Sequence, residues 1–257
     1  MQEGKKIKLY MGIPSMGSRS DVQCYALRSL EKKYSDKIEF IYPSIFCARI
    51  FHDYMRSEYV KDFLNSDADI IWFLDSDVAP PTNILDLITK HGDEWKLAGA
   101  PYPLFITPPN YDAPQVAFSV YTKMDNGGLT YAQKIPQEGI GFVDGVATGC
   151  IFIKREVFND LEKPYFEFKY ENDTRKLTEG EDLGFCRKVS EKGHKFFIDF
   201  SMVCKHYKQV DLLDVNNYAI MYANQAVMAY DRALRNEFAK KKLGLDQNKS
   251  KIIIPKF

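Results

Sequence analysis

The sequence has no CxxC pair, no long apolar run and no excess of charge of either sign, and each absence excludes a class of protein. Its five cysteines are an odd number without metal-site spacing, which argues against a disulfide scaffold or a zinc site and for a reduced protein. No apolar run approaches the roughly 20 residues of a membrane-spanning helix. Lys and Arg together number 35, as do Asp and Glu, so a polyanion partner is not indicated.

Targeting features are also missing. Positions 1–6 run directly into a strand-like stretch and show no apolar core of a signal peptide. We therefore expect a cytoplasmic protein without a signal peptide or a transmembrane segment. A chain of 257 residues, 45% of them hydrophobic, is long enough for one large α/β domain, with or without an appendage.

Glycine-dependent nucleotide motifs are incomplete. The stretch at 12–19 has the glycine spacing of a P-loop, but Ser18 and Arg19 stand where Lys and Ser/Thr are required, so an NTPase is excluded. GxGxxG is absent, and with it support for a dinucleotide-binding dehydrogenase. Gly17-Ser18-Arg19 resembles a short part of the glycine-rich loop of sugar nucleotidylyltransferases. The longer signature of that family is missing, so this class stays a distant alternative.

The first hundred residues alternate strand-like and helix-like segments at short spacing. Strands are predicted at 6–13, 37–42, 69–74 and 97–100, and helices at 20–34, 48–64 and 80–90. This alternation predicts an α/β fold with a parallel sheet and right-handed crossovers.

The pattern changes after residue 100. A proline-rich loop is predicted at 101–114, an irregular segment at 165–180 and a helix at 181–192. Strands are predicted at 115–123, 129–134, 195–200 and 146–154, the last interrupted at Thr148-Gly149. Asp125-Asn126-Gly127-Gly128 is a strong hairpin signal between two of these strands. Apolar residues at helical spacing predict a long amphipathic helix at 212–238. We therefore expect a catalytic-type domain at 1–208 and a C-terminal extension at 209–257, with that helix and a basic tail.

The most informative stretch is Asp75-Ser76-Asp77, which directly follows the apolar run at 70–74. Residues i and i+2 of a strand face the same way, so both carboxylates are expected at its carboxyl end, where open α/β sheets bind ligands. Two adjacent carboxylates repel unless a cation or proton neutralises them, and a hard divalent ion that also binds a diphosphate fits this need. The alternative is a solvated turn. A second copy, Asp67-Ala68-Asp69, precedes the strand and is predicted to be such a turn.

Two later features could complete this site. Glu181-Asp182 opens a predicted helix, where acidic residues are ordinary because they favour the helix dipole. Asp182 also lies behind the flexible Gly180, beside an irregular segment, and a carboxylate there could accept a proton from a hydroxyl. His206 follows the last predicted strand, and histidine is a common metal ligand, although a lone histidine is more often a surface or core residue. No role is assigned to His52, His91 or His194.

The order of these pieces carries a family resemblance. The matching residues are Gly12-Ile13-Pro14-Ser15, Ala48-Arg49, Phe73-Leu74-Asp75-Ser76-Asp77-Val78, Ala98-Gly99-Ala100-Pro101-Tyr102, the stretch at 146–153 with Thr148-Gly149-Cys150, the stretch at 181–186, and Cys204-Lys205-His206. Over residues 6–207 the chain resembles the nucleotide-sugar-dependent glycosyltransferases of the GT-A fold, and most nearly the compact family-2-like enzymes of bacteria and tailed phages. The resemblance implies a GT-A (Rossmann-like) mixed, mostly parallel sheet flanked by helices, with a C-terminal helical extension.

The sequence departs from the family pattern in two places. Pro43-Ser44 stands where better-known members carry an acidic residue that contacts the nucleotide base. The sequence therefore does not identify the base of the donor. Tyr207 follows His206 where the family often has a small residue.

The resemblance also implies a function, which is metal-dependent transfer of a sugar from a nucleoside-diphosphate sugar, a UDP-sugar being favoured, to a hydroxyl acceptor. Asp77 and His206 would bind Mn²⁺ or Mg²⁺, with Asp75 assisting. Asp182, beside Glu181, would deprotonate the acceptor and give inversion; a retaining reaction follows if Asp182 instead faces the donor sugar. The other implied donor contacts are the nucleoside pocket of Pro14 and Ser15, the charge of Arg49 near the phosphates, and the close backbone approach at Gly149.

Several points stay open at this stage. Tyr102, Phe105, Tyr165 and Phe166 are candidates for stacking on a sugar or for ordinary packing. The acceptor could be a glycan, a lipid-linked sugar, a protein or a modified DNA base. The competing hypotheses are a sugar nucleotidylyltransferase, which would use an NTP and form pyrophosphate, and a non-catalytic nucleotide-sugar-binding protein of the same fold.

Overall fold

The computed structural model describes residues 5–15, 21–44, 51–106, 115–124, 128–174, 176–208, 223–224, 227–228 and 230–233. The chain divides into two compact units, Met1–Lys208 and Gln209–Phe257. In the second unit the described residues are helical, and the rest of the helix predicted at 212–238 lies outside the described residues. Among the described helices, none has the length and apolar character that crossing a membrane requires.

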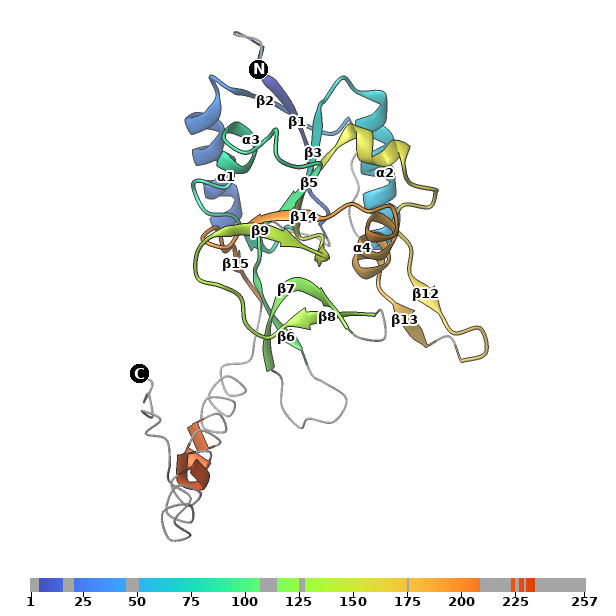
Figure 1. The fold of residues 1–257 in the computed structure, drawn as a ribbon. Coiled ribbons are helices and arrows are strands. Elements are labelled where there is room, and N and C mark those ends of the chain that lie inside the picture. The colour runs from blue at the N-terminus through green and yellow to red at the C-terminus, as the bar shows by residue number, and fades with distance from the viewer. Residues whose placement is uncertain are drawn as a thin grey trace. The chain divides into compact units, whose positions relative to one another are not determined.

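A seven-stranded mixed sheet forms the centre of the first unit (Figure 1). Its order is β2-β1-β3-β11-β5-β14-β9. The strands are β1 (Ile7–Gly12), β2 (Ile38–Ile41), β3 (Ile70–Leu74), β5 (Leu97–Gly99), β9 (Ile140–Val143), β11 (Cys150–Lys154) and β14 (Phe196–Asp199). Five of them run in one direction, and β11 and β9 oppose them. The predicted mixed, mostly parallel α/β sheet is therefore confirmed.

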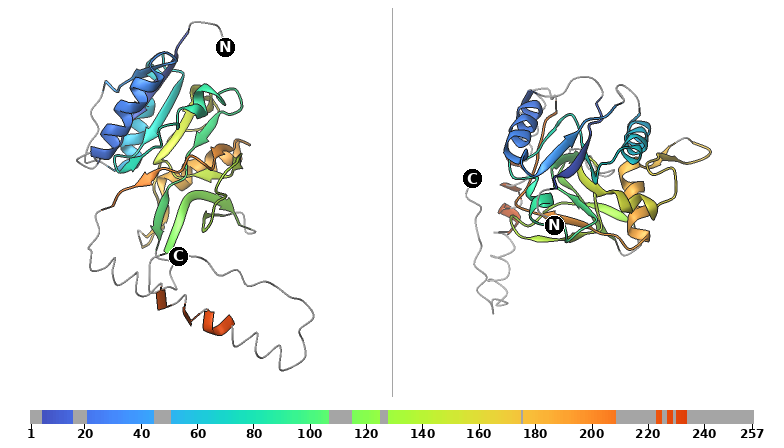
Figure 2. Two further views of the ribbon diagram at one scale, coloured as in Figure 1. Left: turned by 90° about the vertical axis from the view of Figure 1, so that its left-hand side faces the viewer. Right: turned by 90° about the horizontal axis from the view of Figure 1, so that it is seen from above.

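Helices cover both faces of this sheet (Figures 1 and 2). One face carries α1 (Asp21–Tyr34) and α3 (Asp86–Thr89), and the other carries α2 (His52–Asn65) and α4 (Glu181–Glu191), with a short 3₁₀ helix η1 (Arg155–Asn159) after β11. Neighbouring residues of β14 point to opposite faces of the sheet. Phe196 packs against Phe185 of α4, and Phe197 packs against His91, which lies just after α3. This alternation is the two-residue period of a strand.

β3 is the most deeply enclosed strand, and all five of its side chains are buried. Trp72 stacks on Phe152 of β11 with ring centroids 5.0 Å apart, while Phe73 meets Phe166 edge-on from the opposite face. A strand covered on both faces appears in the sequence as a continuous apolar run, which explains the stretch at 70–74. Because β3 is enclosed on both faces, the residues that follow it, Asp75-Ser76-Asp77, emerge at the edge of the sheet. We call these three residues the acidic turn.

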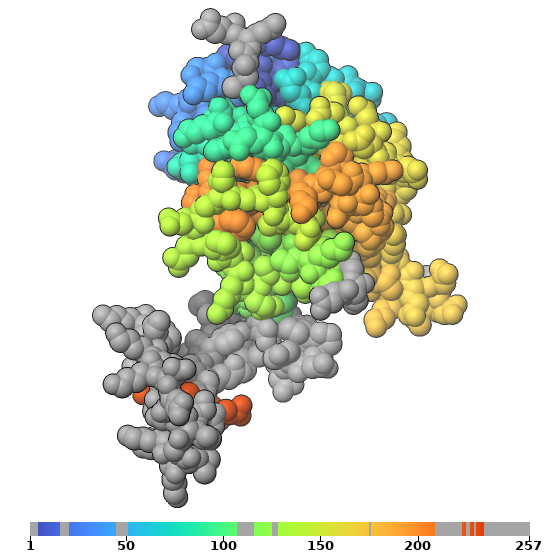
Figure 3. Space-filling model, in the orientation of Figure 1, coloured from blue at the N-terminus to red at the C-terminus, as the bar shows by residue number. Residues whose placement is uncertain are grey.

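Smaller sheets surround the carboxyl end of β3. One contains β6 (Pro103–Ile106), β7 (Gln115–Lys123), β8 (Leu129–Ala132) and β10 (Gly145–Val146). Another pairs β4 (Val78–Ala79) with β15 (Lys205–His206). A third is the hairpin of β12 (Lys169–Tyr170) and β13 (Leu177–Glu179), which projects from the surface of this unit (Figure 3).

Some predicted elements differ from the structure. The segment expected to be a loop at 101–114 contains β6, whose backbone pairs with β7. The helix expected at 80–90 is α-helical only in α3, because turns from Pro81 to Leu85 bond three residues back, as Ile84 N does to Pro81 O. The strand predicted at 146–154 is interrupted at Thr148-Gly149 as expected, but its two parts, β10 and β11, belong to different sheets. The predicted hairpin joins β7 and β8, although residues 125–127 lie outside the described part.

Candidate functional site

The turn after β3 is held by its backbone. Asp75 N donates to Gly149 O at 2.9 Å, and Val78 N donates to Asp75 O at 3.0 Å. Gln23, fully buried on α1, donates from Nε2 to the carbonyls of Asp75 and Val78. Since the chain turns at these residues, the strand alternation ends at β3. Both carboxylates line one cavity, but they have different protein partners.

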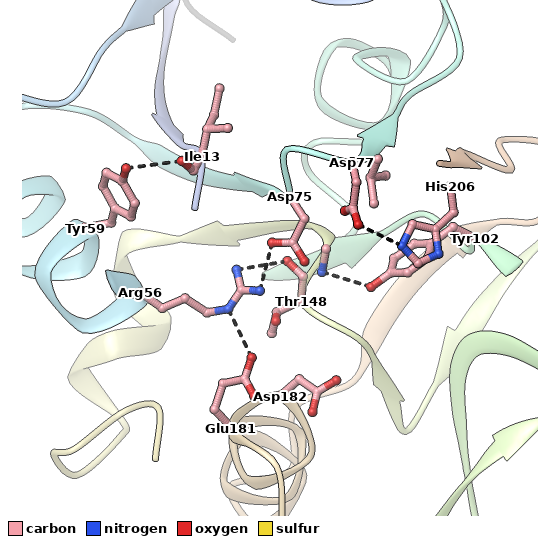
Figure 4. A network of polar contacts seen from close by, with 12 residues as sticks. Ile13, Arg56, Tyr59, Asp75, Asp77, Tyr102, Thr148, Glu181, Asp182 and His206 are labelled. Atoms are coloured by element: carbon pink, nitrogen blue, oxygen red, sulfur yellow. Dashed lines mark hydrogen bonds and ion pairs between the residues drawn. The ribbon is translucent and has the colours of Figure 1, made fainter. Parts of the chain in front are cut away.

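Asp75 is bound by a buried arginine that the sequence analysis missed (Figure 4). Arg56 of α2 is 2% exposed, and its Nη2 donates to Asp75 Oδ1 at 2.9 Å. Its Nη1 donates to Thr148 O at 3.4 Å, and its Nε lies 3.6 Å from Glu181 Oε1. The one local signal was an arginine on the apolar face of α2, in helical register with the buried Tyr59 and Phe63.

Asp77 turns to the other side, toward His206 (Figure 4). The β4–β15 pair places His206 opposite Val78, and Tyr207 N donates to Asp77 O at 2.8 Å. Pro103 O can only accept, so His206 Nδ1 carries the proton in their 2.8 Å hydrogen bond. Nε2 is then the atom that faces Asp77 Oδ2, at 3.4 Å.

The charge on Asp77 is stabilised within this cluster. Burial alone would raise the pKa of Asp77, but its hydrogen bonds with His206 and Lys208 outweigh that effect and lower the pKa to about 2. Lys208 Nζ contacts the same Oδ2 atom that faces His206. The sequence analysis did not single out Lys208, which lies at the end of the first unit.

A divalent ion fits the Asp77–His206 pair. In the part of the chain that the structure describes, no group of three or more His, Cys, Asp or Glu side chains is arranged to hold a metal ion. The predicted set of Asp75, Asp77 and His206 is therefore not gathered as three ligands, since Asp75 is turned to Arg56. Asp77 Oδ2 and His206 Nε2 nevertheless lie 3.4 Å apart, and when Nε2 carries no proton both atoms can serve as ligands of one cation. Ions such as Mg²⁺ are commonly held by one or two protein ligands, with substrate phosphates supplying others.

A cavity of about 420 Å³ joins these residues. It is lined by Pro14, His52, Asp75, Ser76, Asp77, Tyr102, Leu104, His206 and Lys208. Four predicted site residues thus reach one space: Pro14, Asp75, Asp77 and His206. His52, to which the sequence gave no role, joins them from the start of α2.

The second Asp-x-Asp is exposed, as predicted. Asp67 and Asp69 are exposed at the opposite, amino end of β3. Asp67 pairs with the ammonium of Lys8, and Asp69 Oδ2 accepts from Lys8 N at 2.8 Å. They line a separate cavity of about 500 Å³.

Gly149 allows a close approach, but the approaching group belongs to the protein. A Cβ atom at this position would lie 2.4 Å from the hydroxyl oxygen of Tyr102, 2.8 Å from its Cζ, and 3.1 Å from Asp75 Oδ2. The Tyr102 hydroxyl in turn accepts from Gly149 N at 3.2 Å. Tyr102 is buried and meets the His206 ring edge-on, so Gly149 sets the position of a ring that supports the predicted metal ligand.

Gly149→Ala is therefore expected to destabilise the fold. Overpacking of this kind typically costs about 1–3 kcal/mol, which for a chain of this size lowers the melting temperature by about 2–10 °C. Gly141→Ala is a matched control, because its added Cβ would meet only Phe200 Cε2 at 3.7 Å. Thermal unfolding of both variants measures the difference, and an unchanged melting temperature for Gly149→Ala would contradict the close contact.

The two acidic residues that open α4 have different partners. Glu181 is buried and paired with Arg56, and burial raises its pKa against the lowering effect of that arginine. Asp182 Oδ2 accepts from the Tyr121 hydroxyl at 2.7 Å, and its Oδ1 accepts from Leu183 N at 2.7 Å. Tyr121 is itself hydrogen-bonded to Tyr131. A carboxylate has about four acceptor positions, so these contacts leave Asp182 able to accept a further proton.

Asp182 is not among the residues that line this cavity, but its charge acts on one of them, Tyr102. Burial raises the pKa of Tyr102 well above its usual range, and the charges of Asp75 and Asp182 both raise it further. The two carboxylates therefore act on the same phenol, which lines the cavity. Figure 4 shows Asp182 beside Glu181 on α4, below the Asp75 and Asp77 turn.

The remaining predicted residues vary in their placement. Pro14 lines the cavity after Ile13, whose carbonyl accepts from the Tyr59 hydroxyl at 3.2 Å, and Ser15 beside it is half-buried. Arg49 lies outside the described residues. Of the aromatic candidates, Tyr165 and Phe166 are buried in core contacts, Phe105 is exposed, and Tyr102 alone lines the cavity.

Comparisons with known proteins support the fold. No protein-family model matches the chain, and no curated protein matches it in sequence. The crystal structure of A197 from STIV is similar, with a TM-score of 0.51 and 22% identity over 79% of this chain and 86% of A197. The crystal structure of GalNAc-T7 with UDP, GalNAc and Mn²⁺ aligns with a TM-score of 0.46 and 11% identity over 81% of this chain, which spans 45% of that protein. The sheet topology and the similarity to A197 agree with the predicted fold class, a GT-A-like mixed α/β fold.

Proposed function

We propose that this protein is a metal-dependent glycosyltransferase that moves a sugar from a nucleoside-diphosphate sugar, with a UDP-sugar favoured, to a hydroxyl acceptor. The observation that carries the proposal is the single cavity where Asp75, Asp77 and His206 meet at the carboxyl end of β3. Its position is the ligand-binding edge of an open α/β sheet. The family resemblance of the sequence, to compact family-2-like enzymes of bacteria and tailed phages, points the same way.

In this proposal, Asp77 and His206 hold Mn²⁺ or Mg²⁺ together with the donor diphosphate. When bound, the ion supplies Lewis-acid stabilisation of the leaving nucleoside diphosphate. Lys208 lies against Asp77 and offers a further positive charge at the same wall of the cavity. Pro14 and Ser15 line the nucleoside side, and Arg49 adds positive charge near the phosphates.

Asp182 is proposed as the general base. It takes the proton of the acceptor hydroxyl, whose oxygen attacks the anomeric carbon from the face opposite the leaving group, and the product has inverted configuration. The Tyr121 hydroxyl orients the carboxylate by donating to Oδ2. Glu181 is the poorer candidate because it is buried against Arg56.

Product analysis tests this function against its alternatives. The protein is incubated with UDP-, GDP-, CDP- and ADP-sugars and Mn²⁺, and released nucleoside diphosphate is measured with and without candidate acceptors. Release of the diphosphate with a glycosylated product supports the proposal. Pyrophosphate formed from an NTP and a sugar phosphate would instead identify a nucleotidylyltransferase, and nucleotide binding without turnover on any acceptor would favour a binding protein.

A further inference from the structure

We infer that Arg56 is a positioning residue that fixes the Asp75 carboxylate for the nucleotide donor, and that it excludes Glu181 from proton transfer by binding it. The inference rests on the proposed function, because it assigns a role within the same cavity. Nothing in the sequence motifs pointed to this residue.

One guanidinium joins three segments of the chain at this site. Arg56 contacts the acidic turn through Asp75, the segment before β11 through Thr148 O, and the start of α4 through Glu181. Its guanidinium carbon also lies 5.4 Å from the centre of the Phe73 ring. Two of these segments carry proposed site residues, Asp75 on the acidic turn and Asp182 at the start of α4, so Arg56 links the donor side of the site to the proposed base.

Arg56 and Asp75 differ in their access to solvent. Arg56 is 2% exposed, whereas the Asp75 side chain is 24% exposed and lines the cavity. Arg56 therefore binds Oδ1 of Asp75 from inside the protein, while the same carboxylate remains open to a ligand. An arrangement of this kind holds a ligand-contacting group in one orientation, as outer-shell hydrogen bonds do for metal ligands.

The charge and the planar shape of Arg56 both suit a positioning role. One guanidinium faces two carboxylates, Asp75 and Glu181, so the cluster keeps a net negative charge beside Asp77. Buried ion pairs are seldom the most stabilising solution for a protein core, so stability alone is a weak reason for this one. The planar fork of arginine donates in several fixed directions at once, which a lysine ammonium does not reproduce.

Arg155 provides a matched control at the opposite end of β3. Its guanidinium donates to the backbone carbonyls of Phe63, Leu64, Ser66 and Ala68. It also lies 4.6 Å from the centre of the Phe63 ring. Arg155 thus resembles Arg56 in its packing against an aromatic ring and its hydrogen bonding, but it is remote from the cavity of Asp75 and Asp77.

The test compares Arg56→Lys with Arg155→Lys in the full chain. Binding of UDP, GDP, CDP and ADP with Mn²⁺ is measured by calorimetry at a temperature where each variant is folded. We expect Arg56→Lys to weaken binding of the nucleotide that wild type prefers by about 10–100-fold. Arg155→Lys is expected to stay within about twofold of wild type, since a purely structural arginine changes stability and leaves the affinity of the folded protein unchanged.

A double-mutant cycle with Asp75→Asn separates positioning from general support. If Arg56 acts through Asp75, Arg56→Lys adds little to the loss already caused by Asp75→Asn. Additive losses, or wild-type affinity in folded Arg56→Lys, would overturn the inference. If Arg56→Lys does not fold, the neutral pair Arg56→Gln/Asp75→Asn replaces it, and wild-type affinity in that variant overturns the inference equally.

Nucleotide binding by wild type separates failure of the proposed function from failure of the role of Arg56 alone. Wild type that binds none of the four nucleotides would sink the proposed function, and the inference with it. Wild type that binds one of them, with Arg56→Lys binding equally well, would remove only the role of Arg56.

Discussion

Asp182→Asn is expected to lower the transfer rate by about 10²–10⁴-fold, the usual contribution of a general base. Nucleotide binding should stay within about twofold, because the proposed base meets the acceptor hydroxyl rather than the diphosphate. Asparagine keeps an oxygen that can accept from the Tyr121 hydroxyl, which lies 2.7 Å from Asp182 Oδ2, so the local structure is preserved. The measurements are steady-state transfer rate and calorimetric affinity for the same nucleotide.

The neighbouring acid is the matched comparison for this variant. Glu181→Gln should reduce the rate by less than about tenfold, because Glu181 is engaged with Arg56 and takes no proton in this mechanism. Equal losses in both variants would contradict the assignment of Asp182. A larger loss of transfer rate in Glu181→Gln than in Asp182→Asn would identify Glu181 as the general base.

Asp77→Asn is expected to remove the dependence of nucleotide binding on Mn²⁺. The substitution takes away the charged oxygen that faces His206 Nε2 across 3.4 Å, so the proposed ion loses one of two protein ligands. We expect the affinity measured with Mn²⁺ to fall by roughly 100-fold, at the upper end of the effects known for perturbed metal sites. A Mn²⁺ titration at a fixed nucleotide concentration measures the change.

The second Asp-x-Asp supplies the control for the first. Asp67→Asn alters an exposed carboxylate of the same motif at the other end of β3. It should leave the Mn²⁺ midpoint unchanged. If Asp77→Asn also binds nucleotide with an unchanged Mn²⁺ midpoint, the ion is not held where this account places it.

The acidic turn was predictable because its signal is local. A buried strand appears as an apolar run, and the residues after it must emerge at the edge of the sheet. Pairing of β15 with β4 brings His206 to Asp77 across more than a hundred residues, and only the family order of motifs indicated that closeness. The sequence could not predict the partner of each carboxylate, because Arg56 binds Asp75 while His206 and Lys208 contact Asp77.

Arg56 shows what local patterns could not predict. Its partners are distant along the chain, with Asp75 19 residues away and Thr148 92 residues away. An arginine on an apolar helix face indicates a buried partner without identifying it. Gly149 gave a related signal, since a glycine indicates a close approach but not whether a ligand or Tyr102 makes it.

The central claim is most directly tested by thermal unfolding of the wild-type protein with UDP, GDP, CDP and ADP, each with and without Mn²⁺. A ligand at about 100 times its dissociation constant adds roughly 2.7 kcal/mol to the folded state, which for this size is a rise of about 5–10 °C. The account predicts such a rise for one nucleotide, and only when Mn²⁺ is present. No shift with any nucleotide, or an equal shift without Mn²⁺, would contradict the metal–diphosphate site at Asp77 and His206.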